Sequence, residues 1–102
     1  MKKVANIMIE RESHPSRVGP RITAIRETLG KTKAELADSI SFSRSTLTKV
    51  EKGEVGLDIA VGERIADTYG FGLDFIYRGD FDDVPLELRE SLVKNLNAAR
   101  SN

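Results

Sequence analysis

The stretch TKAELADSISFSRSTLTKVEKG, residues 32–53, decides the fold because it holds two short helical patterns separated by only a few residues. Thr32 and Glu35 have the spacing of a capping box at the start of the first helix, and Ser43 is suited to cap the second. Apolar residues recur at the spacing of two buried helical faces: Leu36, Ala37, Ile40, Phe42, Leu47 and Val50. This pattern predicts two short helices that cross at a steep angle, which is the helix-turn-helix arrangement.

Helical patterns on both sides of this stretch predict an all-α fold. Gly19 and Pro20 are expected to open a helix that ends at Gly30, because proline is favoured at a helix start and glycine at its end. Downstream, Asp58 is expected to cap a helix that ends at Gly70, and residues 73–79 form a short fifth helix. Inward positions expected in these two helices are Ile59, Ile65, Ala66, Tyr69, Leu73 and Ile76.

The last part of the chain predicts one further helix after an acidic break, GDFDDVP. Pro85 is suited to start it, and one face then carries Leu88, Leu92, Leu96 and Ala99. Before the helical region, residues 4–10 (VANIMIE) have the composition of a short strand. The three expected segments are therefore an N-terminal arm at 1–17, a helical domain at 18–79 and a C-terminal helical extension at 80–102.

Composition narrows the classes of function. The chain has 102 residues, 39% of them hydrophobic, enough for one compact domain. It contains no cysteine and one histidine, so disulfides and thiolate metal sites are excluded, and His14 beside Pro15 is expected to lie in a solvated loop. We therefore expect no metal, no cofactor and no enzymatic activity. No apolar run reaches the length of a membrane span, so we expect a cytoplasmic protein.

Charge is distributed unevenly although the formal net charge is zero. Basic residues dominate the first 33 positions, whereas acidic residues dominate from Glu54 to the end. A basic N-terminal part and an acidic C-terminal part are typical of a protein that docks one face on phosphates.

Residues 21–79 resemble the DNA-binding domain of the phage repressor and Cro group, the Xre-type helix-turn-helix regulators. The matching pieces are RITAIRETLG, TKAELADSI, SRSTLTKVEKG, LDIAVGERIADTYG and LDFIYRG. The resemblance implies a five-helix lambda-repressor-like bundle, here with an N-terminal arm and a C-terminal helix added. It also implies a repressor, of phage or prophage type, that binds double-stranded DNA as a homodimer and controls transcription.

The resemblance also implies roles for single residues. Contacts to base edges are expected from Arg44, Ser45, Thr48 and Lys49, because arginine and lysine can reach guanine O6 and N7. Phosphate contacts are expected from Lys33, Ser43 and Thr46. The loop after Gly53 lacks the basic residues common in the family, so Arg17, Arg21 and the N-terminal arm are expected to supply further phosphate contacts. Arg26 and Glu51 match a structural ion pair of the family that holds the second helix of the motif against the body.

Two departures from the family pattern concern the backbone. Ser41 occupies the turn position where the family has glycine, at an expected cost of about 1 kcal/mol. Gly62 lies in the middle of an expected helix, which weakens that helix by up to about 1 kcal/mol.

Two alternatives stay open. The dimer contact is expected from either the arm or the C-terminal helix. A different class of function, a protein-interaction module such as an antitoxin that grips a partner protein, is also compatible with the missing basic loop.

Overall fold

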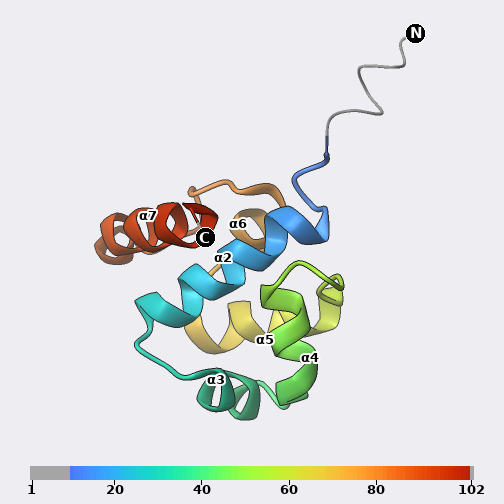
Figure 1. Cartoon of the computed structure of the whole chain (residues 1–102). Helices are drawn as coiled ribbons and strands as arrows, with labels where there is room; N and C mark the ends of the chain where they lie inside the picture. Colours follow the sequence, from blue (N-terminus) through green and yellow to red (C-terminus); the bar gives the residue numbers. More distant parts are fainter. Residues whose placement is uncertain (1–9, 102) are drawn as a thin grey trace, which may run out of the picture.

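The computed structural model describes residues 10–101, and all of its regular structure is helical (Figure 1). The helices of this part of the chain are α2 (Pro15–Thr28), α3 (Lys33–Ser39), α4 (Arg44–Glu51), α5 (Ile59–Tyr69), α6 (Leu73–Arg78) and α7 (Leu86–Ser101). The fold class expected from the sequence is therefore confirmed. The first nine residues of the arm lie outside the described residues, and with them the strand expected at residues 4–10 apart from Glu10, which has no regular secondary structure.

The core is organised around α2, which crosses the molecule between α7 on one side and α4 on the other (Figure 1). Ile22, Ile25 and Ala24 of α2 are completely buried, as are Leu36 of α3 and Leu47 of α4. The other helices add Ile65, Phe75, Ile76 and Leu92 to the same cluster. One continuous core therefore joins the helix-turn-helix segment to the rest of the chain.

The first helix begins earlier than the sequence predicted. It starts at Pro15, and His14 is its N-cap, with its Nδ1 accepting a hydrogen bond of 3.1 Å from the backbone N–H of Ser16. Pro20 lies inside the helix, so the prediction that Gly19 and Pro20 open it was wrong. His14 lies before the first helical residue and is exposed to solvent, as predicted. Both prolines fit a helix start by sequence, and the one with a capping side chain before it takes that place.

The environment of Arg21 also differs from the prediction. Its position falls on the buried face of α2, next to Ile22, and its side chain is fully inaccessible to solvent. Its Nη1 donates to the carbonyl oxygens of Glu12 at 2.8 Å and Ile76 at 3.1 Å, and its Nη2 pairs with the Glu12 carboxylate. Burial lowers the pKa of Arg21, and the Glu12 carboxylate opposes that shift. The prediction that Arg21 contacts phosphate is therefore corrected, because its guanidinium is committed inside the protein.

The turn between α3 and α4 has the conformation expected from its sequence. Ser41 adopts a left-handed backbone with a φ of 53°. Nη1 of Arg64, on α5, donates to the carbonyl oxygens of Ile40 at 2.9 Å and Ser41 at 3.0 Å. The strained turn is thus held by a side chain from outside the motif.

Close packing explains the glycine inside α5. A Cβ on Gly62 would lie 2.7 Å from the hydroxyl oxygen of Tyr77, which in turn donates a 2.8 Å hydrogen bond to the carbonyl of Leu57. Burial raises the pKa of the Tyr77 hydroxyl to about 12. At the start of α5, Asp58 occupies the N-cap without a side-chain hydrogen bond, and Ile59 is 55% exposed, so its predicted inward position was wrong.

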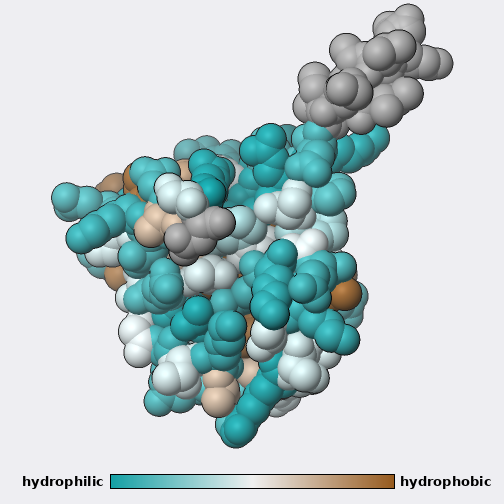
Figure 2. Space-filling model, in the orientation of Figure 1, coloured by the Kyte–Doolittle hydropathy of each residue, from teal (hydrophilic) through white to brown (hydrophobic). Residues whose placement is uncertain are grey.

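The C-terminal helix α7 packs along α2 (Figure 1). Leu92 and Leu96 are buried there, and Asn95 Nδ2 donates to Thr28 Oγ1 at 2.9 Å. Leu86 and Val93 remain exposed. The view in Figure 2 shows a mainly hydrophilic surface with scattered apolar side chains. Most of the apolar stripe of α7 is thus used within the chain itself.

Candidate nucleic-acid interface

Helix α4 has one face in the core and one face towards solvent. Leu47 and Val50 point inward and are at most 1% exposed, whereas Arg44, Ser45 and Lys49 are exposed. Ser43 caps the helix by accepting a 3.2 Å hydrogen bond from the N–H of Thr46. The polar edge that the sequence assigns to base contacts is therefore accessible.

The inner face of α4 touches the backbone of α2 at Gly19. A Cβ on this glycine would lie 2.6 Å from the carbonyl oxygen of Val50 and 2.8 Å from that of Glu51. The lack of a side chain is what allows the two helices to approach this closely. The function of Gly19 is thus a close helix crossing and not a helix start.

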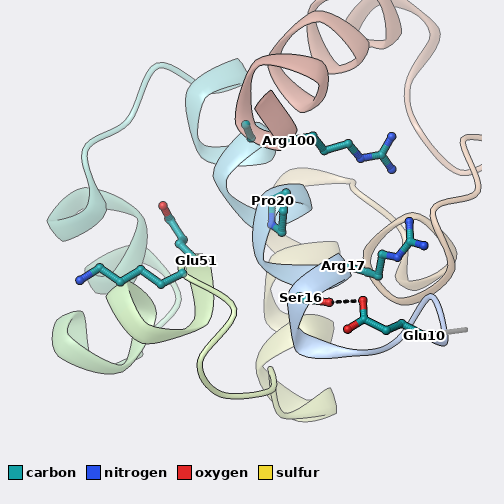
Figure 3. Close-up of a pocket in the computed structure, with 8 residues that line it drawn as sticks. Glu10, Ser16, Arg17, Pro20, Glu51 and Arg100 are labelled. Atoms are coloured by element: carbon teal, nitrogen blue, oxygen red, sulfur yellow. Dashed lines mark hydrogen bonds between the residues drawn. The ribbon is translucent and has the colours of Figure 1, made fainter. Parts of the chain in front are cut away.

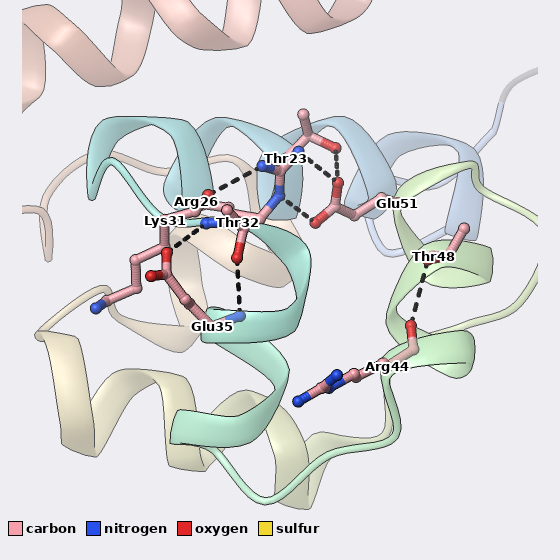
Figure 4. A network of polar contacts seen from close by, with 8 residues as sticks. All are labelled: Thr23, Arg26, Lys31, Thr32, Glu35, Arg44, Thr48 and Glu51. Carbon is pink, nitrogen blue, oxygen red and sulfur yellow. Dashed lines mark hydrogen bonds and ion pairs between the residues drawn. The ribbon is translucent and has the colours of Figure 1, made fainter.

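The predicted ion pair between Arg26 and Glu51 is confirmed (Figure 4). Arg26 Nε donates to Glu51 Oε2 at 2.8 Å, and its Nη2 donates to Oε1 at 3.1 Å. Thr23 Oγ1 adds a 3.0 Å bond to Oε1, and the two charged side chains are only 14% and 5% exposed. The hydrogen bond to Glu51 raises the pKa of Arg26. These bonds fix the carboxyl end of α4 to α2.

The other end of α4 carries an ion pair that the sequence did not predict. Arg44 Nε donates to Asp38 Oδ1 at 3.0 Å, and its Nη2 donates to Oδ2 at 2.6 Å. The pair joins α3 to α4 and is solvent-accessible, at 64% for Arg44 and 57% for Asp38. The hydrogen bonds lower the pKa of Asp38 and raise that of Arg44. No sequence signal for the pair existed, because it depends on the angle between the two helices.

The hydroxyl groups of the predicted site partly bond to each other or to the backbone. Ser43 Oγ lies 3.1 Å from Ser45 Oγ, and Thr48 Oγ1 donates to the carbonyl of Arg44 at 3.2 Å (Figure 4). Thr46 and Thr48 are half-buried. The exposed lysines, Lys33 and Lys49, have no ion pair among residues 10–101.

A hollow of about 650 Å³ lies where the first half of α2, the end of α4 and the end of α7 meet (Figure 3). Arg17, Lys52 and Arg100 line it, together with Glu10 and Glu51. The charge of Glu51 is already matched by Arg26. An adjacent, smaller hollow extends along α2 to Lys33. The sequence did not point to Lys52 or Arg100 as part of this hollow. For Lys52 a local signal existed, because it directly follows the last residue of α4.

A comparison with protein-family models decides the assignment. A model described as a helix-turn-helix domain matches residues 17–74, more than half of the chain. The chain belongs to this helix-turn-helix family. No curated protein and no solved structure matches it.

The matched helix-turn-helix domain contains α3 and α4 in full, and membership supports binding of DNA. Helix α7 lies outside the match and forms an added support on α2. Within the described part of the chain, no helix has the length and apolar character to cross a membrane. The same residues hold no group of three or more His, Cys, Asp or Glu arranged around a metal position.

Proposed function

We propose that this helix-turn-helix protein is a sequence-specific transcriptional regulator of the phage repressor and Cro type, which binds an operator through the major groove as a homodimer. The observation that supports this most directly is the two-sided environment of α4. Its inner face is anchored by the core and by Glu51, while its outer edge offers Arg44, Ser45 and Lys49 to solvent. The major groove, about 12 Å wide, admits such a helix.

Base reading is proposed for Arg44 and Lys49, whose donors match guanine O6 and N7, with Ser45 and Thr48 as shorter contacts at the same edge. Phosphate contacts are proposed for Lys33, Ser43, Thr46 and Arg17, and the geometry adds Lys52. All of these lie on α2, α3, α4 or at their ends. Phosphate contacts fix the position of the protein, whereas base contacts specify the sequence.

The homodimer is proposed because one chain presents one recognition helix, and operators of this type offer two half-sites about 34 Å apart. Most apolar positions of α7 are used against α2, which leaves Leu86 and Val93 exposed on that helix. The contact is proposed to involve one of the two ends, the arm at 1–17 or the extension at 80–102. Light scattering of the full chain tests this, and a mass of one chain at micromolar concentration contradicts it.

The deciding experiment is selection of binding sites from random duplex DNA with the purified full chain, followed by affinity measurements over a range of salt concentrations. Arg44→Ala should cost about 1–3 kcal/mol on the selected site and relax preference at one position. Lys33→Ala should weaken binding to all sequences alike. Equal losses for both variants on specific and random DNA would contradict the assignment. A stoichiometric protein partner with no selected DNA sequence would instead favour the antitoxin-like alternative.

A further inference from the structure

We infer that Asp38 is a positioning residue for base reading: it holds the guanidinium of Arg44 by its side edge so that the adjacent end edge is presented, already oriented, to a guanine. The inference rests on the proposed function and goes beyond it. It assigns specificity to an acidic residue of α3, a helix from which the resemblance implies only the phosphate contact of Lys33.

Asp38 occupies only one of the two hydrogen-bonding edges of the Arg44 guanidinium. A guanidinium has five N–H groups arranged along two usable edges, a side edge made by Nε and one Nη and an end edge made by the two Nη atoms. Asp38 binds the side edge, since Oδ1 accepts from Nε at 3.0 Å and Oδ2 accepts from Nη2 at 2.6 Å. Both hydrogens of Nη1 and the second hydrogen of Nη2 stay available. The free end edge is therefore the pair of parallel donors that fits guanine O6 and N7.

The bond to Asp38 also limits the conformational freedom of the Arg44 side chain. A long, exposed arginine samples many rotamers, and binding a base then requires it to give up that freedom. The two-point bond to Asp38 restricts the guanidinium before DNA arrives. Asp38 is itself well placed, because it is on the last turn of α3 and the following turn is bonded by Arg64.

The negative charge of Asp38 acts against DNA binding in general. A carboxylate at a surface that meets DNA repels phosphates, so Asp38 is expected to lower affinity for any sequence. Because both partners are more than half exposed, the pair contributes little to folding. Asp38 thus lowers the affinity for any DNA and adds little to the stability of the fold. A gain in discrimination between bases explains its presence, and an oriented Arg44 provides that gain.

The test is selection from random duplex DNA with four full-length proteins: the wild type, Asp38→Asn, Arg44→Ala and the double variant. Arg44→Ala identifies the operator position that Arg44 reads. At that position, Asp38→Asn should lower the preference for guanine about fivefold, because asparagine has one acceptor oxygen where aspartate has two. Its affinity for random DNA should stay the same or rise. In the Arg44→Ala background, Asp38→Asn should leave base preference unchanged.

Asp67→Asn is the matched control, since Asp67 is an exposed acid on α5 that makes no bond to Arg44. It removes the same charge and should leave the guanine preference intact. An unchanged or higher guanine preference in Asp38→Asn, with a normal Arg44→Ala result, overturns the inference while the proposed function stands. If the wild type selects no sequence at all, the proposed function fails and the inference fails with it.

Discussion

Each end of α4 carries an arginine–carboxylate ion pair, and the two pairs differ in burial. At the carboxyl end, the Arg26–Glu51 pair is 14% and 5% exposed and gains a third donor from Thr23. At the amino end, the Arg44–Asp38 pair is 64% and 57% exposed. Both are two-point arginine–carboxylate bonds. Burial therefore decides whether such a bond serves mainly the fold or remains available to a ligand.

This difference gives α4 one fixed end and one open end. The fixed end is continuous with the core through Val50 and with the backbone of α2 through Gly19. The open end carries the side chains proposed to meet the base edges. A helix that is held rigidly at one end can present the other at a defined angle without burying it.

The largest effect is expected from Gly19→Ala, which attacks the fixed end directly. The new Cβ would meet the carbonyl oxygens of Val50 and Glu51, which belong to the backbone and cannot rotate away. We expect a loss of about 3 kcal/mol in the free energy of unfolding, measured by urea denaturation. The control is Gly56→Ala, where the nearest atom to the new Cβ is Pro15 Cγ at 3.9 Å. Equal stability of the two variants would show that the crossing is not close.

A smaller loss is expected from Glu51→Gln. The amide keeps one acceptor oxygen but leaves the charge of Arg26 poorly matched, so unfolding should become easier by about 2 kcal/mol. DNA affinity should fall as well, because α4 loses its anchor to α2. Glu54→Gln removes an exposed carboxylate near the same loop and is the control. If both variants unfold at the same urea concentration, the buried carboxylate of Glu51 stabilises the fold no more than an exposed carboxylate does, and the fixed end of α4 does not depend on its pair with Arg26.

Lys52→Ala tests the phosphate contact proposed for the C-cap of α4, next to its fixed end. Loss of one phosphate contact should reduce the slope of log affinity against log salt by about 0.9, with the sequence preference unchanged. Binding isotherms at four or more salt concentrations measure it. Lys94→Ala, an exposed lysine of α7 that does not line the hollow, should leave the slope as it is. A slope that responds equally to both changes would mean that the contact surface is not localised.

The smallest effect on folding is expected from Asp38→Asn. Since the bond to Arg44 is largely in water, its removal should leave the urea midpoint where it is in the wild type. Together with Glu51→Gln, this variant compares the same bond in two environments. A loss of stability as large as that of Glu51→Gln would remove the contrast between the two ends of α4.

Local signals in the sequence predicted the motif well. The capping box of Thr32 and Glu35 is present with both of its bonds, and the left-handed turn occurs at Ser41. The buried pair of Arg26 and Glu51 was also predicted, through the resemblance. The capping box and the turn depend on residues that are close in the sequence. The ion pair depends on a packing of two helices that recurs in the family.

Features that depend on packing over longer distances were missed. Pro15 and Pro20 fit a helix start equally well by sequence. The burial of Arg21 was missed for a different reason, because it depends on the position of Ile76 on α6. The exposure of Ile59 and the closeness of Gly62 to Tyr77 likewise depend on how α5 meets its neighbours. The Asp38 bond depends on the crossing angle of α3 and α4.

The contact between Arg64 and the turn has a consequence for engineering. The left-handed backbone at Ser41 costs about 1 kcal/mol, and the carbonyl oxygens of Ile40 and Ser41 accept hydrogen bonds from the guanidinium of Arg64 on α5. Residues 32–53 alone therefore do not contain everything that sets their own bend. If this segment were grafted onto a foreign scaffold, its sequence would be the same but its turn would not be held. An equivalent of Arg64 would have to be grafted as well.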